Sequence, residues 1–277
     1  MIEILQLPFM QRALLAALLV GLCAPAVGTF MVQRRLALLG DGIGHVALTG
    51  VALGFLTGAA PVLTAIVVAV VGAVAIELVR ARGRTSGDVA LALLFYGGIA
   101  GGVLLIAIAP GGSNAKLTSY LFGAIASVTT QDIWVIAALA VAVIAVVAIF
   151  GRELFVLCQD EEVAKASGLP VRFLSLLIAV TAALTVVIAM RVVGLLLVSA
   201  LMVIPVATSQ QFTRGFRATM LLSMVFGVIA AVGGLLSSTV SAKVPPGAAI
   251  VLLALTGFVL ALGLGRFVRR GRTEEIA

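Results

Sequence analysis

Long apolar runs separated by short polar segments dominate this chain. A helix needs about 20 residues to cross the roughly 30 Å hydrocarbon core of a bilayer, and most of the runs come close to or reach that length. The pattern predicts an all-α fold, a polytopic transmembrane helical bundle of about nine spans. The predicted spans are residues 14–32, 36–56, 62–78, 89–108, 133–150, 173–190, 192–208, 220–236 and 248–265.

One further apolar segment, residues 117–128, is too short to cross the bilayer. It lies between the glycine-rich segment 110–113 and the polar segment 129–132. A length of about 12 residues is typical of a re-entrant or interfacial helix, and we expect this helix on the outer side.

Composition agrees with this reading. Hydrophobic residues make up 62% of the chain and charged residues 10%. A soluble domain of this composition would lack the polar surface it needs. We therefore expect residues 1–277 to form one membrane domain, and we recognise no cleaved signal peptide at the N-terminus.

The net charge of +7 comes from basic residues that sit mostly at the ends of the apolar runs. They do not form the single basic stripe that indicates a nucleic-acid partner, so we expect no such partner. Under the positive-inside rule the clusters mark cytoplasmic loops, which places the N-terminus outside and the C-terminus inside. The clusters are Arg34 and Arg35; Arg80, Arg82 and Arg84; Arg214 and Arg217; and Arg266, Arg269, Arg270 and Arg272.

Asp41 and His45 stand out because they are ionisable residues inside the second predicted span, and His45 is the only histidine of the chain. If the helix begins just after Arg35, a rise of 1.5 Å per residue puts Asp41 about 9 Å and His45 about 15 Å inward. Ionisable groups at such depth are costly and are candidates for function. With Thr49 they form one polar stripe of the helix.

A carboxylate and an imidazole at positions i and i+4 can bind a transition metal, but two ligands make a weak site. A two-fold homodimer with this stripe on its axis would supply four ligands, enough for zinc or, with waters, for manganese or iron. Alternatively, Asp41 and His45 form an ion pair that only specifies packing.

Gly50, Gly54 and Gly58 form a second stripe, nearly opposite the polar one. A glycine at every fourth position lets a neighbouring helix approach closely. We expect these three residues to serve helix packing.

The longest predicted cytoplasmic connection, residues 151–171, carries a full set of helix start and stop signals. Asp160 is a candidate N-cap, Glu161 and Glu162 fall in the first turn, Lys165 follows Glu161 by four residues, and Gly168 is a candidate stop. The segment is either a solvated linker or a docking element, and its complete signals favour docking.

Nucleotide-binding motifs are not found in the sequence. Gly40-x-Gly42-x-Gly44 lacks the spacing of a dinucleotide fingerprint, and residues 111–116 lack that of a P-loop. We also find no plausible Ser/His/Asp or Cys/His set, so we do not expect this chain to be an enzyme.

Several segments together resemble the membrane permeases of bacterial ATP-binding-cassette importers for zinc, manganese and iron. This family shares its fold with permeases of siderophore and cobalamin importers. The resemblance covers nearly the whole chain and is carried by residues 40–54, residues 120–123 with Asp132, residues 160–171, residues 192–201 and residues 204–208.

The resemblance implies an ATP-driven importer in the bacterial cytoplasmic membrane. It implies Asp41 and His45 as ligands of the transported zinc, manganese or iron, and no permanently bound cofactor. It implies a homodimer surrounded by membrane lipid, with cytoplasmic ATPase subunits docked at the segment from Asp160 to Gly168 and an extracytoplasmic metal-binding protein. Whether Thr49 or Ser199 lines the path stays open.

Two alternatives remain at this point. One is a permease of similar fold for chelated iron or cobalamin, which needs no metal-binding pair. The other is a proton-coupled secondary transporter with Asp41 and His45 as a proton relay. A capped polar segment at 160–168 favours an ATPase-docking subunit over the proton-driven transporter.

Overall fold

All regular elements in the part of the chain that the computed structural model describes are helices. It describes residues 7–81, 87–109, 114–123, 128–239 and 244–274; Arg82 and Arg84 of the second arginine cluster lie outside these ranges. The helices are α2 (Pro8–Gln33), α3 (Leu39–Thr57), α4 (Pro61–Ala81), α5 (Gly87–Ile108), α6 (Asn114–Phe122), α7 (Thr130–Gln159), α8 (Glu161–Ala166), α9 (Val171–Met190), α10 (Leu195–Ser209), α11 (Phe216–Ser238) and α12 (Pro246–Glu274).

The predicted helical membrane fold is confirmed, and the span count needs one refinement. Eight of the described helices are long and apolar enough to cross a membrane. The remaining predicted span, residues 192–208, corresponds to α10, which has 15 residues. At 1.5 Å per residue it is about 22 Å long, shorter than a hydrocarbon core of roughly 30 Å.

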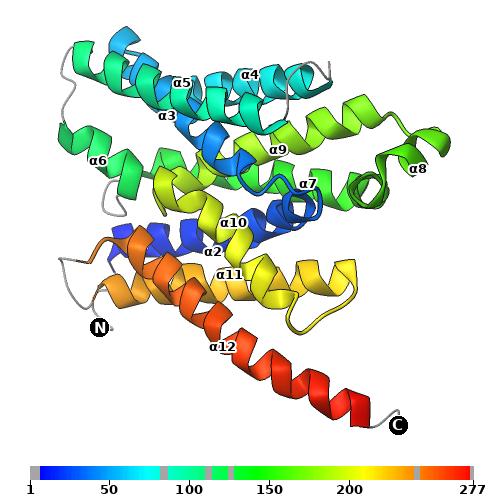
Figure 1. Ribbon diagram of the computed structural model, residues 1–277. Helices are drawn as coiled ribbons and strands as arrows, with labels where there is room; N and C mark the ends of the chain where they lie inside the picture. Colours follow the sequence, from blue (N-terminus) through cyan, green and yellow to red (C-terminus); the bar gives the residue numbers. More distant parts are fainter. Residues whose placement is uncertain (1–6, 82–86, 110–113, 124–127, 240–243, 275–277) are drawn as a thin grey trace.

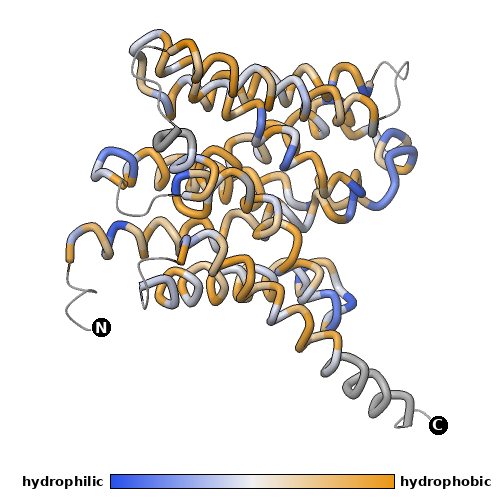
Figure 2. Tube along the Cα trace, turned by 60° about the vertical axis from the view of Figure 1, so that its left-hand side comes forward, coloured by the Kyte–Doolittle hydropathy of each residue, from blue (hydrophilic) through white to orange (hydrophobic). Residues whose placement is uncertain are grey.

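The helices run mostly along one common direction, so the molecule has two ends (Figure 1). One end carries α8, the turn between α10 and α11 and the end of α12; the other carries α6 and the start of α2. Hydrophilic positions gather mostly toward the ends of the helices in Figure 2, while the helix bodies are largely hydrophobic. The arginine pairs Arg34–Arg35 and Arg214–Arg217 share the α8 end, which we call the arginine-rich end.

The interior is built on α2, α3 and α9, whose apolar segments are mostly buried, whereas α5 and α7 lie mostly on the outside. Small residues allow the close packing. A Cβ atom at Gly28 of α2 would lie 1.9 Å from the backbone oxygen of Met202 in α10. Only glycine fits at such a crossing, because any larger side chain would push the two backbones apart.

Two of the helix boundaries that differ from the prediction concern segments with candidate functional residues. α3 begins at Leu39, after a turn at residues 34–38, rather than just after Arg35. α7 continues to Gln159, although its apolar run ends near Phe150. The predicted connection of residues 151–171 is therefore mostly the end of one helix followed by α8, because a helix needs no apolar residues where it leaves the membrane.

Candidate functional site

Asp41 lies in the first turn of α3, two residues after the helix begins. The late start of α3 puts His45 only about 9 Å along the helix from its first residue, instead of about 15 Å. The positive end of the helix dipole stabilises a carboxylate at this position, typically by about 0.3–1 kcal/mol. Part of the cost of placing Asp41 inside the membrane protein is thus offset locally.

His45 is buried between α3 and α5. Its ring meets that of Phe95 edge-on, with centroids 4.4 Å apart. Gly98 of α5 comes so close that a Cβ there would lie 2.6 Å from the backbone carbon of His45. Within the described residues His45 Nδ1 is buried and has no hydrogen-bond partner. A buried, unpaired imidazole nitrogen is costly, and a cation is one group that would satisfy it.

Thr49, in contrast to His45, has a hydrogen-bond partner. Its hydroxyl donates a hydrogen bond of 2.8 Å to the backbone oxygen of Gly98. Thr49 therefore ties α3 to α5, which leaves Asp41 and His45 as the candidate functional side chains of the predicted three-residue stripe.

Ser199 of α10 is a second buried polar group near the start of α3. Its Oγ lies 3.0 Å from where a Cβ of Gly40 would be, and it has no hydrogen-bond partner among the described residues. Gly40 directly precedes Asp41. The sequence alone left the role of this serine open.

The glycine stripe of α3 divides into two kinds of position. Gly50 and Gly54 contact α4: added Cβ atoms would lie 2.7 Å from Ala65 Cα and from Pro61 Cα, respectively. Gly58 has no atom within 4 Å and instead ends α3 with φ +71°. The packing role predicted for Gly58 is therefore wrong, since this glycine serves the left-handed helix stop.

The described residues of one copy do not provide a complete set of metal-binding side chains. No three His, Cys, Asp or Glu residues come together in the described ranges in a way that could hold a metal ion. A metal ion bound by Asp41 and His45 would therefore need further ligands, from a second copy of the chain, from water or from both.

α8 has the local structure that its sequence predicts. The Asp160 side chain accepts hydrogen bonds from the backbone N–H groups of Glu162 and Val163, and Gly168 follows with φ +75°. Lys165 pairs with Glu161 and Glu162, and hydrogen bonds to these carboxylates raise its pKa. The exposed pairs add little stability, so the cap and the stop define this helix.

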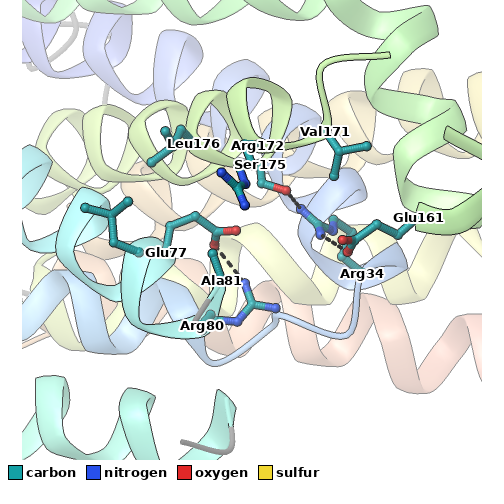
Figure 3. Close-up of a pocket in the computed structure, with 10 residues that line it drawn as sticks. Arg34, Glu77, Arg80, Ala81, Glu161, Val171, Arg172, Ser175 and Leu176 are labelled. Carbon is teal, nitrogen blue, oxygen red and sulfur yellow. Dashed lines mark hydrogen bonds and ion pairs between the residues drawn. The ribbon is translucent and has the colours of Figure 1, made fainter. Parts of the chain in front are cut away.

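Arg34 connects α8 to the interior. Its guanidinium donates to Ser175 Oγ of α9 at 2.9 Å and lies 3.5 Å from a Glu161 oxygen (Figure 3). Gln33 donates to Gln159 at 3.0 Å, directly before α8. Two residues where α2 ends therefore contact the end of α7 and the start of α8. The turn after them leads into α3 and to Asp41. In the sequence, only the charge of Arg34 pointed to this contact.

At the opposite end, Asp132 of α7 forms an ion pair with Arg191, which follows α9. Thr129 and Asp132 form a reciprocal capping box at the start of α7. Arg191 also donates to the hydroxyl of Tyr120 at 3.1 Å and stacks over its ring. Burial raises the pKa of Tyr120, although the nearby Arg191 lowers it, so the phenol stays neutral. We call Tyr120, Thr129, Asp132 and Arg191 the outer cluster.

Comparison with known proteins decides the family. The profile described as "ABC 3 transport family" matches residues 6–265. The chain belongs to this family.

Relatives match the ABC 3 chain over nearly its whole length. The manganese transport system membrane protein MntC of Halalkalibacterium halodurans is 34% identical, over 99% of this chain and 96% of the relative. The manganese import system permease protein ScaB of Streptococcus gordonii is 32% identical, over 95% and 94%.

Solved structures resemble the ABC 3 chain as well. PsaBC from Streptococcus pneumoniae in complex with Fab matches with a TM-score of 0.85 and 34% identity, covering 94% of this chain and 93% of that one. An inward-facing conformation of a putative metal-chelate type ABC transporter matches with a TM-score of 0.74 and 16% identity, over 91% and 85%, a likeness of fold alone. The family predicted from the sequence motifs is thereby confirmed, and the ABC 3 chain is a multi-pass membrane protein.

Proposed function

We propose that this chain is the transmembrane subunit of an ATP-driven importer that moves a divalent metal cation into the cytoplasm, with manganese as the first candidate. Membership of an ABC family supports ATP over a proton gradient as the energy source. The names of MntC and ScaB support manganese. Zinc and ferrous iron also accept Asp and His ligands, so ligand type alone does not choose among these metals.

Asp41 and His45 are the residues that we propose to contact the cation during transit. The observation that carries this proposal is the buried Nδ1 of His45, which lacks a partner within the described residues and lies one helical turn from a carboxylate. A transit site must replace part of the hydration shell and then release the ion, so a loose two-residue contribution from each copy suits it. Two copies of the chain would bring two such pairs together at a common axis.

Around this subunit we propose two cytoplasmic ATPase subunits that dock at α8 and hydrolyse the ATP, and an extracytoplasmic metal-binding protein that delivers the ion. The cap at Asp160, the stop at Gly168 and the attachment of Arg34 to Glu161 support docking at α8, because they make a short, fixed and polar projection. We further propose that the arginine-rich end faces the cytoplasm.

Uptake of radioactive manganese by proteoliposomes that contain the complete complex tests the proposed site. Asp41→Asn and His45→Ala should each lower the rate by at least about 100-fold, since removal of supporting groups around metal ligands alone costs about 10–100-fold. Thr57→Ala, on the same helix with an exposed hydroxyl, should transport like the unmodified protein. Wild-type uptake by Asp41→Asn would contradict the proposal.

Orientation has its own test. Cysteines placed in the segment from Asp160 to Gly168 should resist a membrane-impermeant thiol reagent applied to intact cells. Cysteines at Gly112 or Lys243, which lie outside the described residues, should react. Rapid labelling of the first group would reverse the proposed topology.

A further inference from the structure

A groove separates α7 from α11 at the arginine-rich end. Both helices pack along α2 and make few contacts with each other. Between the last turns of α7 and the first turns of α11 this leaves a cavity of about 890 Å³. Its volume falls within the roughly 300–1,000 Å³ that small-molecule sites occupy.

Aromatic rings line the base of the groove. The ring of Phe216 lies 5.1 Å from that of Phe30 and 4.8 Å from that of Phe155, measured between centroids. Val147 of α7 and Leu221 of α11 add aliphatic walls. Such a surface gains free energy when it is covered by hydrocarbon rather than by water.

Two glycines, Gly151 and Gly215, line the groove. A Cβ atom added at Gly151 or Gly215 would meet no atom within 4 Å. Gly151 is inside α7, where glycine is unfavourable relative to alanine by up to about 1 kcal/mol. Packing within the protomer therefore does not explain why position 151 is a glycine, whereas a molecule bound in the groove would.

Arg152 and Arg217 give the groove a positive margin. Both line it, both are exposed, and neither forms an ion pair within the described residues. The first turn of α11 contains no acidic residue that would neutralise Arg217. α7 has 30 residues and is about 45 Å long, which exceeds the roughly 30 Å core and places Arg152 near the membrane surface.

We propose that this groove binds an anionic phospholipid of the leaflet at the arginine-rich end. The phosphate contacts Arg152 and Arg217, and an acyl chain covers Phe30, Phe155 and Phe216. Arginine presents forked N–H donors that match phosphate geometry, and basic pockets between transmembrane helices suit anionic head groups. A free phosphate ion would leave the aromatic base uncovered. The inference does not depend on the transported substrate, so it goes beyond the proposed function.

Native mass spectrometry of the assembled complex tests this inference, using mixed micelles with phosphatidylglycerol and phosphatidylcholine of identical acyl chains. The unmodified complex should retain phosphatidylglycerol with a preference on the order of tenfold. The double variant Arg152→Gln/Arg217→Gln should retain both lipids equally. Gly151→Leu, which fills the groove, should lose both.

Two matched variants control for general effects: Arg172→Gln removes an exposed arginine at the same end, and Gly257→Leu fills an open glycine position of α12. Both variants should keep the preference for phosphatidylglycerol over phosphatidylcholine. The proposal is wrong if the unmodified complex shows no preference, if Arg172→Gln loses it as fully as the double variant, or if inorganic phosphate displaces the lipid. Absence of retained lipid in the assembled complex would mean that a protein subunit covers the groove, which also contradicts the proposal.

Discussion

Two polar sites of this membrane protein differ in how their acidic residues are paired. In the outer cluster, Asp132 accepts hydrogen bonds from the backbone N–H and the hydroxyl of Thr129. It also forms an ion pair with Arg191, which donates a hydrogen bond to the Tyr120 hydroxyl. On α3, His45 Nδ1 is buried without a hydrogen-bond partner in the described residues, and Asp41 lies in the first turn of the helix without an ion pair to a lysine or arginine of the described residues. A paired polar group holds a structure together, whereas a buried polar group without a partner is available for a ligand.

The largest effect on stability is expected in the outer cluster. Arg191→Gln leaves Asp132 without its charge partner and should lower the free energy of unfolding by up to about 3 kcal/mol, as removal of one member of a buried pair does. Asp41→Asn should change it by only about 0.3–1 kcal/mol, the contribution of a charge at a helix start.

Unfolding in detergent, followed by circular dichroism, measures both values. The double variant Asp132→Asn/Arg191→Gln should be less destabilised than the sum of its single variants, because the two residues interact directly. Equal losses for Arg191→Gln and Asp41→Asn would remove the distinction between the two sites.

A smaller effect is expected where α5 crosses His45. Gly98→Ala would place a Cβ 2.6 Å from the His45 backbone carbon, and overpacking of this kind costs about 2 kcal/mol. It should also lower metal uptake, because α5 must move away from the imidazole. Gly97→Ala is the matched control, since a Cβ there meets no atom within 4 Å. Unchanged unfolding and uptake in Gly98→Ala would show that α5 does not position His45.

The smallest effect on stability is expected at α8. Gly168→Val forces a branched side chain into a left-handed backbone with φ +75°, at a cost of about 1 kcal/mol confined to the end of a short exposed helix. The permease should still fold and insert, but metal-stimulated ATPase activity of the reconstituted complex should fall. Gly168→Asn tolerates this backbone and should retain activity. Full coupling in Gly168→Val would argue against docking at this segment.

The fold and the local motifs were predictable for physical reasons. Apolar runs of nearly 20 residues dictate membrane helices, and the signals at Asp160 and Gly168 act within a few residues of the chain. The extension of α7 to Gln159 was missed, because polar residues after Phe150 end the hydrophobic pattern but not the helix. The role of Gly58 was missed for a related reason: spacing alone does not separate a packing glycine from a helix stop.

The surroundings of the site depended on contacts between distant segments. Arg191 meets Asp132 across 59 positions of the chain, and Phe95 meets His45 from another helix. No periodicity in one sequence encodes which helices become neighbours. The sequence therefore pointed to Asp41 and His45 as candidate ligands, while the pairing that separates them from the outer cluster needed the structure.

Electron–nuclear double resonance of manganese(II) held in the reconstituted complex tests the central claim most directly. His45 is the only histidine in the chain, so a permease labelled with ¹⁵N-histidine, free of histidine tags and combined with unlabelled partners, carries one labelled imidazole per copy. The account predicts a ¹⁵N coupling to manganese that disappears in His45→Ala. A complex that transports manganese at the normal rate, holds the ion within the membrane subunits and shows no ¹⁵N coupling would contradict it.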